Sequence, residues 1–374
     1  MAARPSTKPQ QGPVDLVAFG TIMALLVIGI MTVFSASYTT ALHMYGDPHY
    51  FIKRQLLWAV IGIIGMLVMM RIDYRKLRPW ALPALLVAVL LLSIVLVAGT
   101  ESRGGQRWLE IGPIRFQPSE LSKIALVNFI AAYVAFLGDK MGRFWSGFVI
   151  PMAVVGVVGG LVALEDLGTA VVIMGTGALM LFVAGARPLY LVLSGIVGAI
   201  GGWFFIQQDP VRMKRITAFL DPWADPRGAG WNIIQSLYAI GSGGIFGLGL
   251  TQSRQKFAYL PEQYTDFIFS VLAEELGFVA TTTVVCLFFV LAWRGLRISL
   301  RAPDMFGAML AIGITAMIVL QAFLNMGVVT GSLPVTGITL PLISFGGSSL
   351  SVTLASLGIL LNISKAAERR GSYR

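Results

Sequence analysis

Ten stretches of about 20 mostly apolar residues recur along the chain, and each is long enough to cross a bilayer as an α-helix. Charged residues make up only 12% of the 374 positions, whereas soluble domains contain about 25%. The expected spans are 14–38, 56–71, 79–99, 118–138, 145–164, 167–186, 188–206, 267–293, 306–328 and 342–364. We therefore predict an all-α polytopic membrane protein with about ten transmembrane helices.

The expected organisation is one membrane domain at 14–366, preceded by a polar tail at 1–13 and followed by a basic tail at 367–374. A long loop at about 207–265 separates the seventh and eighth spans. Its part GWNIIQSLYAIGSGGIFGLGL, at 230–250, is apolar and rich in glycine. We expect this part to lie on the membrane surface or dip into it, because glycines permit close approach of two backbones.

Ten spans place both termini on one side of the membrane, and the excess of Lys and Arg indicates that this side is the cytoplasm. The tails and loops of that side hold 16 of the 28 basic residues. The other 12 gather at the start of the second span, before the fourth span and in the 207–265 loop. Long outer loops tolerate such charges, but cations beside membrane helices also suit an anionic lipid headgroup. The sequence does not favour nucleic acid as a partner, because no soluble domain is visible to carry a basic patch.

Charged side chains also fall near the outer ends of the expected helices. A charge at the bilayer centre costs about 2.5–3.5 kcal/mol on insertion scales, so each needs a partner or a function. Glu120 and Lys123, in QPSELSK, share one helix face. They form either a self-satisfied ion pair or part of a polar outer cavity that includes the upstream Arg107 and Trp108. Glu165 and Asp166 lie in the turn EDLGTA. A tight turn accounts for one acidic residue, so the presence of two leaves a functional role open for either of them.

Three carboxylates lie in TDFIFSVLAEELG, at 265–277. Asp266 is expected at a helix N-terminus, where it either caps the helix or carries chemistry. Capping does not explain Glu274 and Glu275, which lie about 12–14 Å further along the helix axis. Neither the two histidines nor the single cysteine has metal-ligand spacing, so we predict no metal site built from protein ligands.

Taken together, six segments resemble the SEDS family (shape, elongation, division and sporulation), and the similarity covers about residues 14–366. The segments are KRQLLWA at 53–59, GGQRWLEIGPIRFQPSELSK at 104–123, EDLGTA at 165–170, GWNIIQSLYAIGSGGIFGLGL at 230–250, YLPEQYTDFIFSVLAEELG at 259–277 and GITLPLISFGGSSL at 337–350. The runs SRQKFAYLPE and PLISFGGSS are more similar to the FtsW and SpoVE branch than to RodA.

The resemblance implies a glycosyltransferase of the bacterial cytoplasmic membrane that polymerises lipid II on the outer face and releases undecaprenyl pyrophosphate. It implies Asp266 as the catalytic residue, and it marks Trp108, Glu120 and Lys123 as functionally important. Glu274 and Glu275 are expected to support the site through hydrogen bonds to neighbouring helices. The remaining candidates for substrate binding are Arg54, Arg107, Asp166 and Lys256. The family often has proline before the aspartate of EDLGTA, where this chain has Glu165.

One carboxylate base within a group of cations suits a transferase with a phosphate leaving group, since pyrophosphate needs charge neutralisation rather than protonation. A divalent cation, Mg²⁺ or Mn²⁺, is the one cofactor considered. The expected partners are a class B penicillin-binding protein, other division or elongation proteins, and membrane lipids. Two alternatives stay open: a transporter that flips lipid II, and a scaffold without enzymatic activity, which would leave Asp266 unexplained.

Overall fold

The structure is a computed structural model that describes residues 12–102, 105–111, 114–253, 255 and 260–367. Within these residues the chain forms twelve α-helices and three short strands. The helices are α1 (Leu16–Tyr45), α2 (Tyr50–Arg71), α3 (Ala81–Ala98), α4 (Pro118–Leu137), α5 (Ile150–Glu165), α6 (Leu167–Val183), α7 (Pro188–Gln207), α8 (Pro210–Leu220), α9 (Trp231–Gly243), α10 (Ile268–Arg301), α11 (Met305–Val329) and α12 (Gly347–Ala367). The strands are β1 (Thr100–Ser102), β2 (Gly105–Ile111) and β3 (Ile114–Phe116).

Nine helices in the described part of the chain are long and apolar enough to cross a membrane, and the 17-residue α6 is a shorter apolar helix. These ten correspond to the ten predicted spans, so the polytopic all-α fold is confirmed. One boundary differs in a way that matters for the site. The last span was expected from residue 342, but α12 begins at Gly347, because residues 333–346 form irregular backbone and turns instead of a helix.

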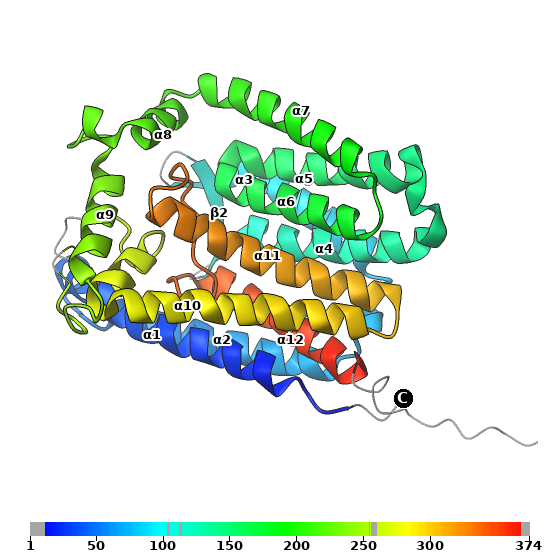
Figure 1. Ribbon diagram of the computed structural model, residues 1–374, viewed down its shortest axis with the longest axis horizontal. Coiled ribbons are helices and arrows are strands. Elements are labelled where there is room, and N and C mark those ends of the chain that lie inside the picture. The colour runs from blue at the N-terminus through cyan, green and yellow to red at the C-terminus, as the bar shows by residue number, and fades with distance from the viewer. Residues whose placement is uncertain (1–11, 103–104, 112–113, 254, 256–259, 368–374) are drawn as a thin grey trace, which may run out of the picture.

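Helix α11 lies at the centre of the bundle, in contact with α4, α6, α10 and α12 (Figure 1). On one side of it α2 packs along α12, and on the other α5 packs along α6. Helix α7 lies apart from this bundle at the upper edge of Figure 1, and none of its residues is buried. The site is therefore built around α11 and its neighbours.

The first and last described residues lie at the same end of the bundle, where the backbone N–H of Gly12 donates to the Lys365 carbonyl (3.1 Å). We call this the termini end, and it lies at the right of Figure 1. At the same end Arg294 forms an ion pair with Asp15. The opposite end carries α8, α9 and the antiparallel β1–β2–β3 hairpins, and we call it the loop end. The sequence did not predict these strands.

Helix α10 is interrupted at Gly277, whose φ of 73° and ψ of −169° are not helical. In an uninterrupted helix, the carbonyls of Glu274 and Glu275 would accept hydrogen bonds from the residues four positions later. Here residues 244–249 of the preceding loop provide the hydrogen-bond partners instead. The four exchanged hydrogen bonds run from Leu248 N to Glu274 O (2.9 Å), from Gly249 N to Glu275 O (2.9 Å), from Phe278 N to Gly244 O (2.9 Å) and from Val279 N to Ile245 O (3.2 Å).

Glycines make this exchange possible. A Cβ atom at Gly243 or Gly247 would overlap the backbone of α10, and a Cβ atom at Gly277 would overlap the backbone nitrogen of Gly247. Gly247 and Gly277 also have positive φ angles, of 80° and 73°, which favour glycine. The prediction that the glycines of 230–250 allow close backbone approach is confirmed.

Candidate active site

Asp266 lies in the turn that leads into α10, and the backbone of this turn is held by hydrogen bonds from elsewhere in the chain. Three successive carbonyls accept them: Phe345 N donates to Tyr264 O (2.9 Å), Ser344 Oγ to Thr265 O (2.6 Å) and Asn325 Nδ2 to Asp266 O (2.8 Å). The N-cap position of α10 is occupied by Phe267, which makes no side-chain cap hydrogen bond. The capping interpretation of Asp266 therefore loses its main support.

The side chains of Asp266 and Arg107 both lie next to Gly337. A Cβ atom at this glycine would lie 3.7 Å from Oδ2 of Asp266 and 3.9 Å from Nη1 of Arg107. Gly337 has a positive φ of 76°, so a residue with a side chain would be strained there. The carboxylate of Asp266 and the guanidinium of Arg107 thus lie on either side of the space that a side chain at Gly337 would occupy.

Arg107 extends from β2 to the junction of α5 and α6. Its Nε donates to the carbonyl of Glu165 (2.9 Å), and its Nη1 lies 3.4 Å from Oδ2 of Asp166. Asp166 is 4% exposed and caps α6 by accepting from the backbone N–H of Thr169 (3.1 Å). Since Arg107 contacts the carbonyl of Glu165, this contact would survive with another side chain at that position.

Arg215, on α8, is a member of this group that the sequence analysis did not single out. Burial lowers the pKa of its guanidinium, the positive charge of Arg107 lowers it further, and the carboxylates of Asp166 and Asp266 act in the opposite sense. Arg215 is therefore within electrostatic range of Arg107, Asp166 and Asp266. Arginine stays charged at neutral pH, so the loop end presents two guanidinium groups close to Asp266.

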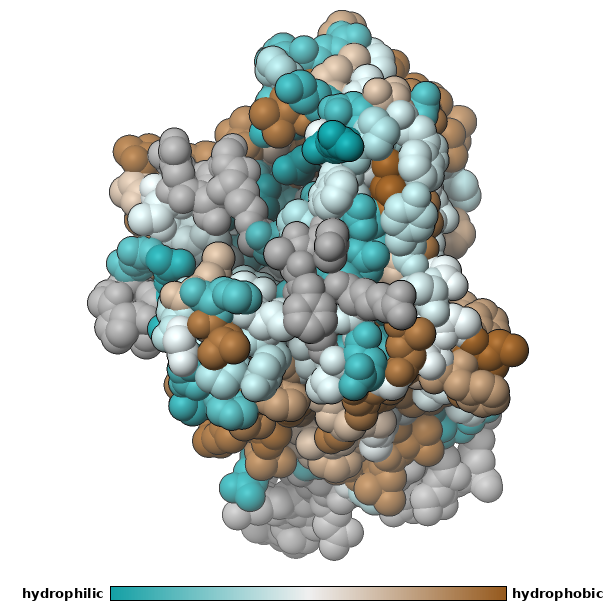
Figure 2. Space-filling view, turned by 90° about the vertical axis from the view of Figure 1, so that its left-hand side faces the viewer, coloured by the Kyte–Doolittle hydropathy of each residue, from teal (hydrophilic) through white to brown (hydrophobic). Residues whose placement is uncertain are grey.

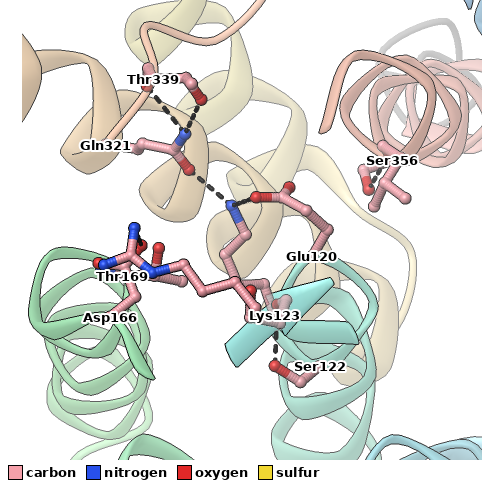
Figure 3. Close-up of polar contacts among 11 residues, drawn as sticks. Glu120, Ser122, Lys123, Asp166, Thr169, Gln321, Thr339 and Ser356 are labelled. Atoms are coloured by element: carbon pink, nitrogen blue, oxygen red, sulfur yellow. Dashed lines mark hydrogen bonds and ion pairs between the residues drawn. The ribbon is translucent and has the colours of Figure 1, made fainter. Parts of the chain in front are cut away.

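Lys123 and Glu120 form an ion pair in the interior of the bundle (Figure 3). The Nζ of Lys123 lies 3.0 Å from Oε1 of Glu120 and donates to Oε1 of Gln321 on α11 (2.7 Å). Gln321 in turn donates through Nε2 to the carbonyl of Thr339 (3.0 Å). The pair is therefore connected to the segment that contains Gly337, and Asp166 lies in the same close-up on α6.

The amides Gln321 and Asn325 were also missed, because only ionisable residues inside the apolar spans were considered. The available signal was QAFLN, in which two amide side chains four residues apart share one face of an apolar helix. Polar side chains in such helices hydrogen-bond across to neighbouring segments.

Glu274 and Glu275 are buried at the interruption of α10, with exposed fractions of 0% and 1%. Oε2 of Glu274 accepts a hydrogen bond from Oγ of Ser253. Oε1 of Glu275 accepts from Oγ of Ser35 on α1 (2.6 Å) and from the backbone N–H of Ser253 (3.4 Å). Both side chains therefore hold the loop after residue 249 against α10, whereas their effect on the site stays a prediction.

Among the described residues, the contacts of Arg54 and Trp108, two predicted substrate-binding residues, lie outside this network. Arg54 is exposed, and its guanidinium stacks over the ring of Tyr50 at 4.6 Å. Trp108 lies beside Arg107 on β2 and accepts a hydrogen bond at its carbonyl from Oγ1 of Thr100 (3.1 Å). Lys256 lies outside the described residues. The roles of all three stay predictions.

The loop end carries hydrophilic residues near its centre, and hydrophilic and apolar residues are mixed toward its edges (Figure 2). Among the residues that the structure describes, no group of three or more His, Cys, Asp or Glu side chains could hold a metal ion. The group around Asp266 offers two carboxylates, those of Asp266 and Asp166, near the guanidinium groups of Arg107 and Arg215. Chemically, this arrangement can accept a proton and stabilise a neighbouring anion.

Comparisons with known proteins agree with this architecture. Stage V sporulation protein E of Bacillus subtilis (strain 168) is 46% identical over 354 residues, which cover 94% of this chain and 97% of that protein. A protein of Geobacter sp. (strain M18) named probable peptidoglycan glycosyltransferase FtsW is 43% identical over 353 residues, covering 94% of this chain and 96% of that protein.

Solved structures are similar over nearly the whole chain. A chain from the structure titled "Structural coordination of polymerization and crosslinking by a peptidoglycan synthase complex" has a TM-score of 0.79 and 30% identity, and the match covers 96% of this chain and 99% of that one. The rod shape determining protein RodA of Thermus thermophilus has a TM-score of 0.71 and 29% identity, covering 95% and 97%. Residues 16–369 match the family FTSW_RODA_SPOVE, described as "Cell cycle protein". The chain therefore belongs to this family, on the FtsW and SpoVE branch that its sequence motifs indicate.

Proposed function

We propose that this chain is a peptidoglycan glycosyltransferase that joins lipid II units into glycan strands, with Asp266 as the general base. The observation that carries the proposal is the meeting of Asp266 Oδ2 and Arg107 Nη1, both within 4 Å of one point at Gly337. Relatives on the same branch are named probable peptidoglycan glycosyltransferases, which supports the class of reaction.

In the proposed reaction a sugar hydroxyl attacks the anomeric carbon of a lipid-linked sugar. Asp266 accepts the hydroxyl proton as the new carbon–oxygen bond forms and the bond from that carbon to the pyrophosphate oxygen breaks. Undecaprenyl pyrophosphate leaves as an anion, and Arg107 and Arg215 stabilise its charge. A positioned carboxylate base supplies about 10²–10⁴-fold in rate.

A divalent cation, Mg²⁺ or Mn²⁺, is a further proposal and is not needed for any step above. The described residues do not form a metal site on their own. An ion would therefore need oxygens of the pyrophosphate as ligands, together with the carboxylate of Asp266 or Asp166.

The proposed location is the bacterial cytoplasmic membrane, with both termini in the cytoplasm and the loop end outside. The sequence distribution of Lys and Arg supports this orientation. A class B penicillin-binding protein is the proposed partner, which is supported by the likeness to a chain of a peptidoglycan synthase complex.

The alternative of a lipid II transporter has one observation in its favour, since interrupted helices such as α10 are typical of transporters. The gap next to Lys123, however, gives no support for a continuous charged path among the described residues. The small gap next to Lys123 is lined by Thr176, Gly177 and otherwise apolar side chains. This favours the enzyme.

The test is Asp266→Asn in a polymerisation assay with purified lipid II and the cognate partner. Asn keeps the shape of the side chain but cannot accept the proton, so the rate should fall at least about 100-fold. Glu110→Gln is the matched control, because Glu110 also lies at the loop end but is 40% exposed. Near wild-type polymerisation by Asp266→Asn would refute the proposed base, and loss of lipid II flipping in the same variant would favour the transporter.

A further inference from the structure

We propose that Asn325 is a positioning residue for Asp266, which holds the backbone of this aspartate and that of the Gly337 segment in one rigid frame. The inference rests on the proposed function, in which Asp266 is the base. Asn325 lies on α11, the central helix of the bundle, and its side chain is 1% exposed.

The amide nitrogen of Asn325 donates two hydrogen bonds. One goes to the carbonyl of Asp266 and the other to the carbonyl of Ile338, each at 2.8 Å. Ile338 directly follows Gly337, the residue at which Asp266 and Arg107 meet. Both N–H groups of the amide are thus used to join two backbone segments that are more than 70 positions apart in the sequence.

Gln321 holds the same segment one helical turn away. A lysine ammonium can only donate hydrogen bonds, so the contact with Lys123 Nζ (2.7 Å) directs the Gln321 amide oxygen toward Lys123. The amide nitrogen then donates to the carbonyl of Thr339 (3.0 Å). Two consecutive carbonyls, those of Ile338 and Thr339, are therefore fixed to α11, and the buried ion pair orients one of the two amides.

This arrangement supplies what a general base needs. The reactive geometry of a catalytic group tolerates displacements of only about 0.5 Å. Because the Asn325 side chain is buried and directed to backbone carbonyls, its removal should disturb the placement of Asp266 and leave the residues that hold the substrate in place. The expected effect is on kcat more than on KM.

The experiment compares Asn325→Leu and Asn325→Asp with the same two changes at Asn362. Asn362 is an equally suitable buried asparagine, 3% exposed, which donates to the Met70 carbonyl (2.8 Å) at the termini end. Each variant is purified with the partner protein, and kcat and KM for lipid II are measured per folded molecule. Hydrogen–deuterium exchange of the peptide 262–270 reports the backbone around Asp266 independently of activity.

We expect both Asn325 variants to lower kcat at least about tenfold with KM within about twofold, and to raise exchange in the peptide 262–270. The Asn362 variants should lower thermal stability to a similar degree while kcat and this exchange stay at wild-type values. If Asn325→Leu does not fold, Asn325→Asp carries the test, because it keeps the shape of the side chain and removes both N–H donors.

Wild-type kcat in the Asn325 variants would overturn the inference, as would an equal loss of kcat in the Asn362 variants. Asp266→Asn, measured in parallel, separates this failure from a failure of the proposed function. An inactive Asp266→Asn with a fully active Asn325→Leu refutes only the positioning role, whereas an active Asp266→Asn refutes the base itself.

Discussion

Arg107 Nη1 lies 3.4 Å from Oδ2 of Asp166, and that same carboxylate caps the N-terminus of α6 through its other oxygen. The loop-end hairpin is thus tied by charge to the start of a helix in the bundle. With side-chain exposures of 17% and 4%, the pair is poorly solvated. Removing one member of such a pair leaves an uncompensated buried charge, which costs about 3–5 kcal/mol.

We therefore predict that Arg107→Ala lowers both the thermal midpoint and the rate of lipid II polymerisation. In the double variant Arg107→Ala/Asp166→Asn, stability should largely recover because no buried charge is left unpaired, while polymerisation stays low because the cation is absent. Arg115→Ala is the control, since Arg115 is 72% exposed on the neighbouring strand. Wild-type polymerisation by the double variant would contradict the proposed role of Arg107.

The buried pair of Glu120 and Lys123 should behave as a coupled and asymmetric unit. Lys123→Met leaves Glu120 without its cation, and Oε2 of Glu120 already has no hydrogen-bond partner. Glu120→Gln leaves Lys123 with Gln321 as a partner. Lys123→Met should therefore be the more destabilising change, and a double-mutant cycle should give a coupling of about 0.5–3 kcal/mol. Unfolding followed in detergent measures all four proteins, and strictly additive effects would disprove the interaction.

Gly277→Ala should destabilise the protein by at least about 2 kcal/mol, because the change combines backbone strain with overlap. The φ of 73° is unfavourable for alanine, and the new methyl group would meet the backbone of Gly247. Gly160→Ala on α5 is the matched control, since a Cβ atom there meets nothing within 4 Å. Equal thermal midpoints for the two variants would show that position 277 accepts a side chain without strain, which would contradict the prediction.

Stability should also depend on pH through Asp304 at the termini end. Burial raises the pKa of Asp304, but hydrogen bonds from Tyr74, the backbone N–H of Gly307 and Arg75 lower it more, so that the pKa lies below its usual value. A depressed pKa in the folded state stabilises the protein above the unfolded value of about 4 and loses this effect as the pH falls through the folded value. Asp304→Ala should cost about 0.5–2 kcal/mol at pH 7 through the lost cap alone.

The measurement is the thermal midpoint of wild type and Asp304→Ala at several pH values. Their difference should be largest near neutral pH. It should narrow below about pH 4, where Asp304 is protonated in the unfolded chain but still ionised in the folded protein. Asp139, an exposed acid of another loop at the termini end, provides the control through Asp139→Ala. A difference that stays constant down to pH 3 would contradict the electrostatic contribution.

The sequence predicts the spans well because each must contain about 20 apolar residues, whatever its neighbours are. It predicts the boundaries less well where apolar residues are not helical. PLISF, at 341–345, has the composition of a span, but it holds the Asp266 turn through the side-chain hydroxyl of Ser344 and the backbone N–H of Phe345. The interruption of α10 was likewise hidden, because Gly277 differs from other helical glycines only through the loop that packs against it.

The candidate site shows the same limit. Asp266, Arg107 and Asp166 were named from charge and motif, and the structure brings them together. Arg215 was one of several basic residues in the 207–265 loop, and nothing local distinguishes it from Lys214. Which basic residue of α8 faces the site depends on how this helix packs against the rest of the protein. The neighbouring residues in the sequence carry no pattern that would show it.

The stretch 244–249 also bears on how the chain is assembled during synthesis. Backbone groups on both sides of Gly277 find their partners in this stretch, and an unsatisfied backbone group in hydrocarbon costs several kcal/mol. The interrupted form of the eighth span therefore has its hydrogen bonds complete only when the preceding stretch lies against it. We expect this stretch and the span to reach their final arrangement together during insertion, and the turn that carries Asp266 to take its place with them.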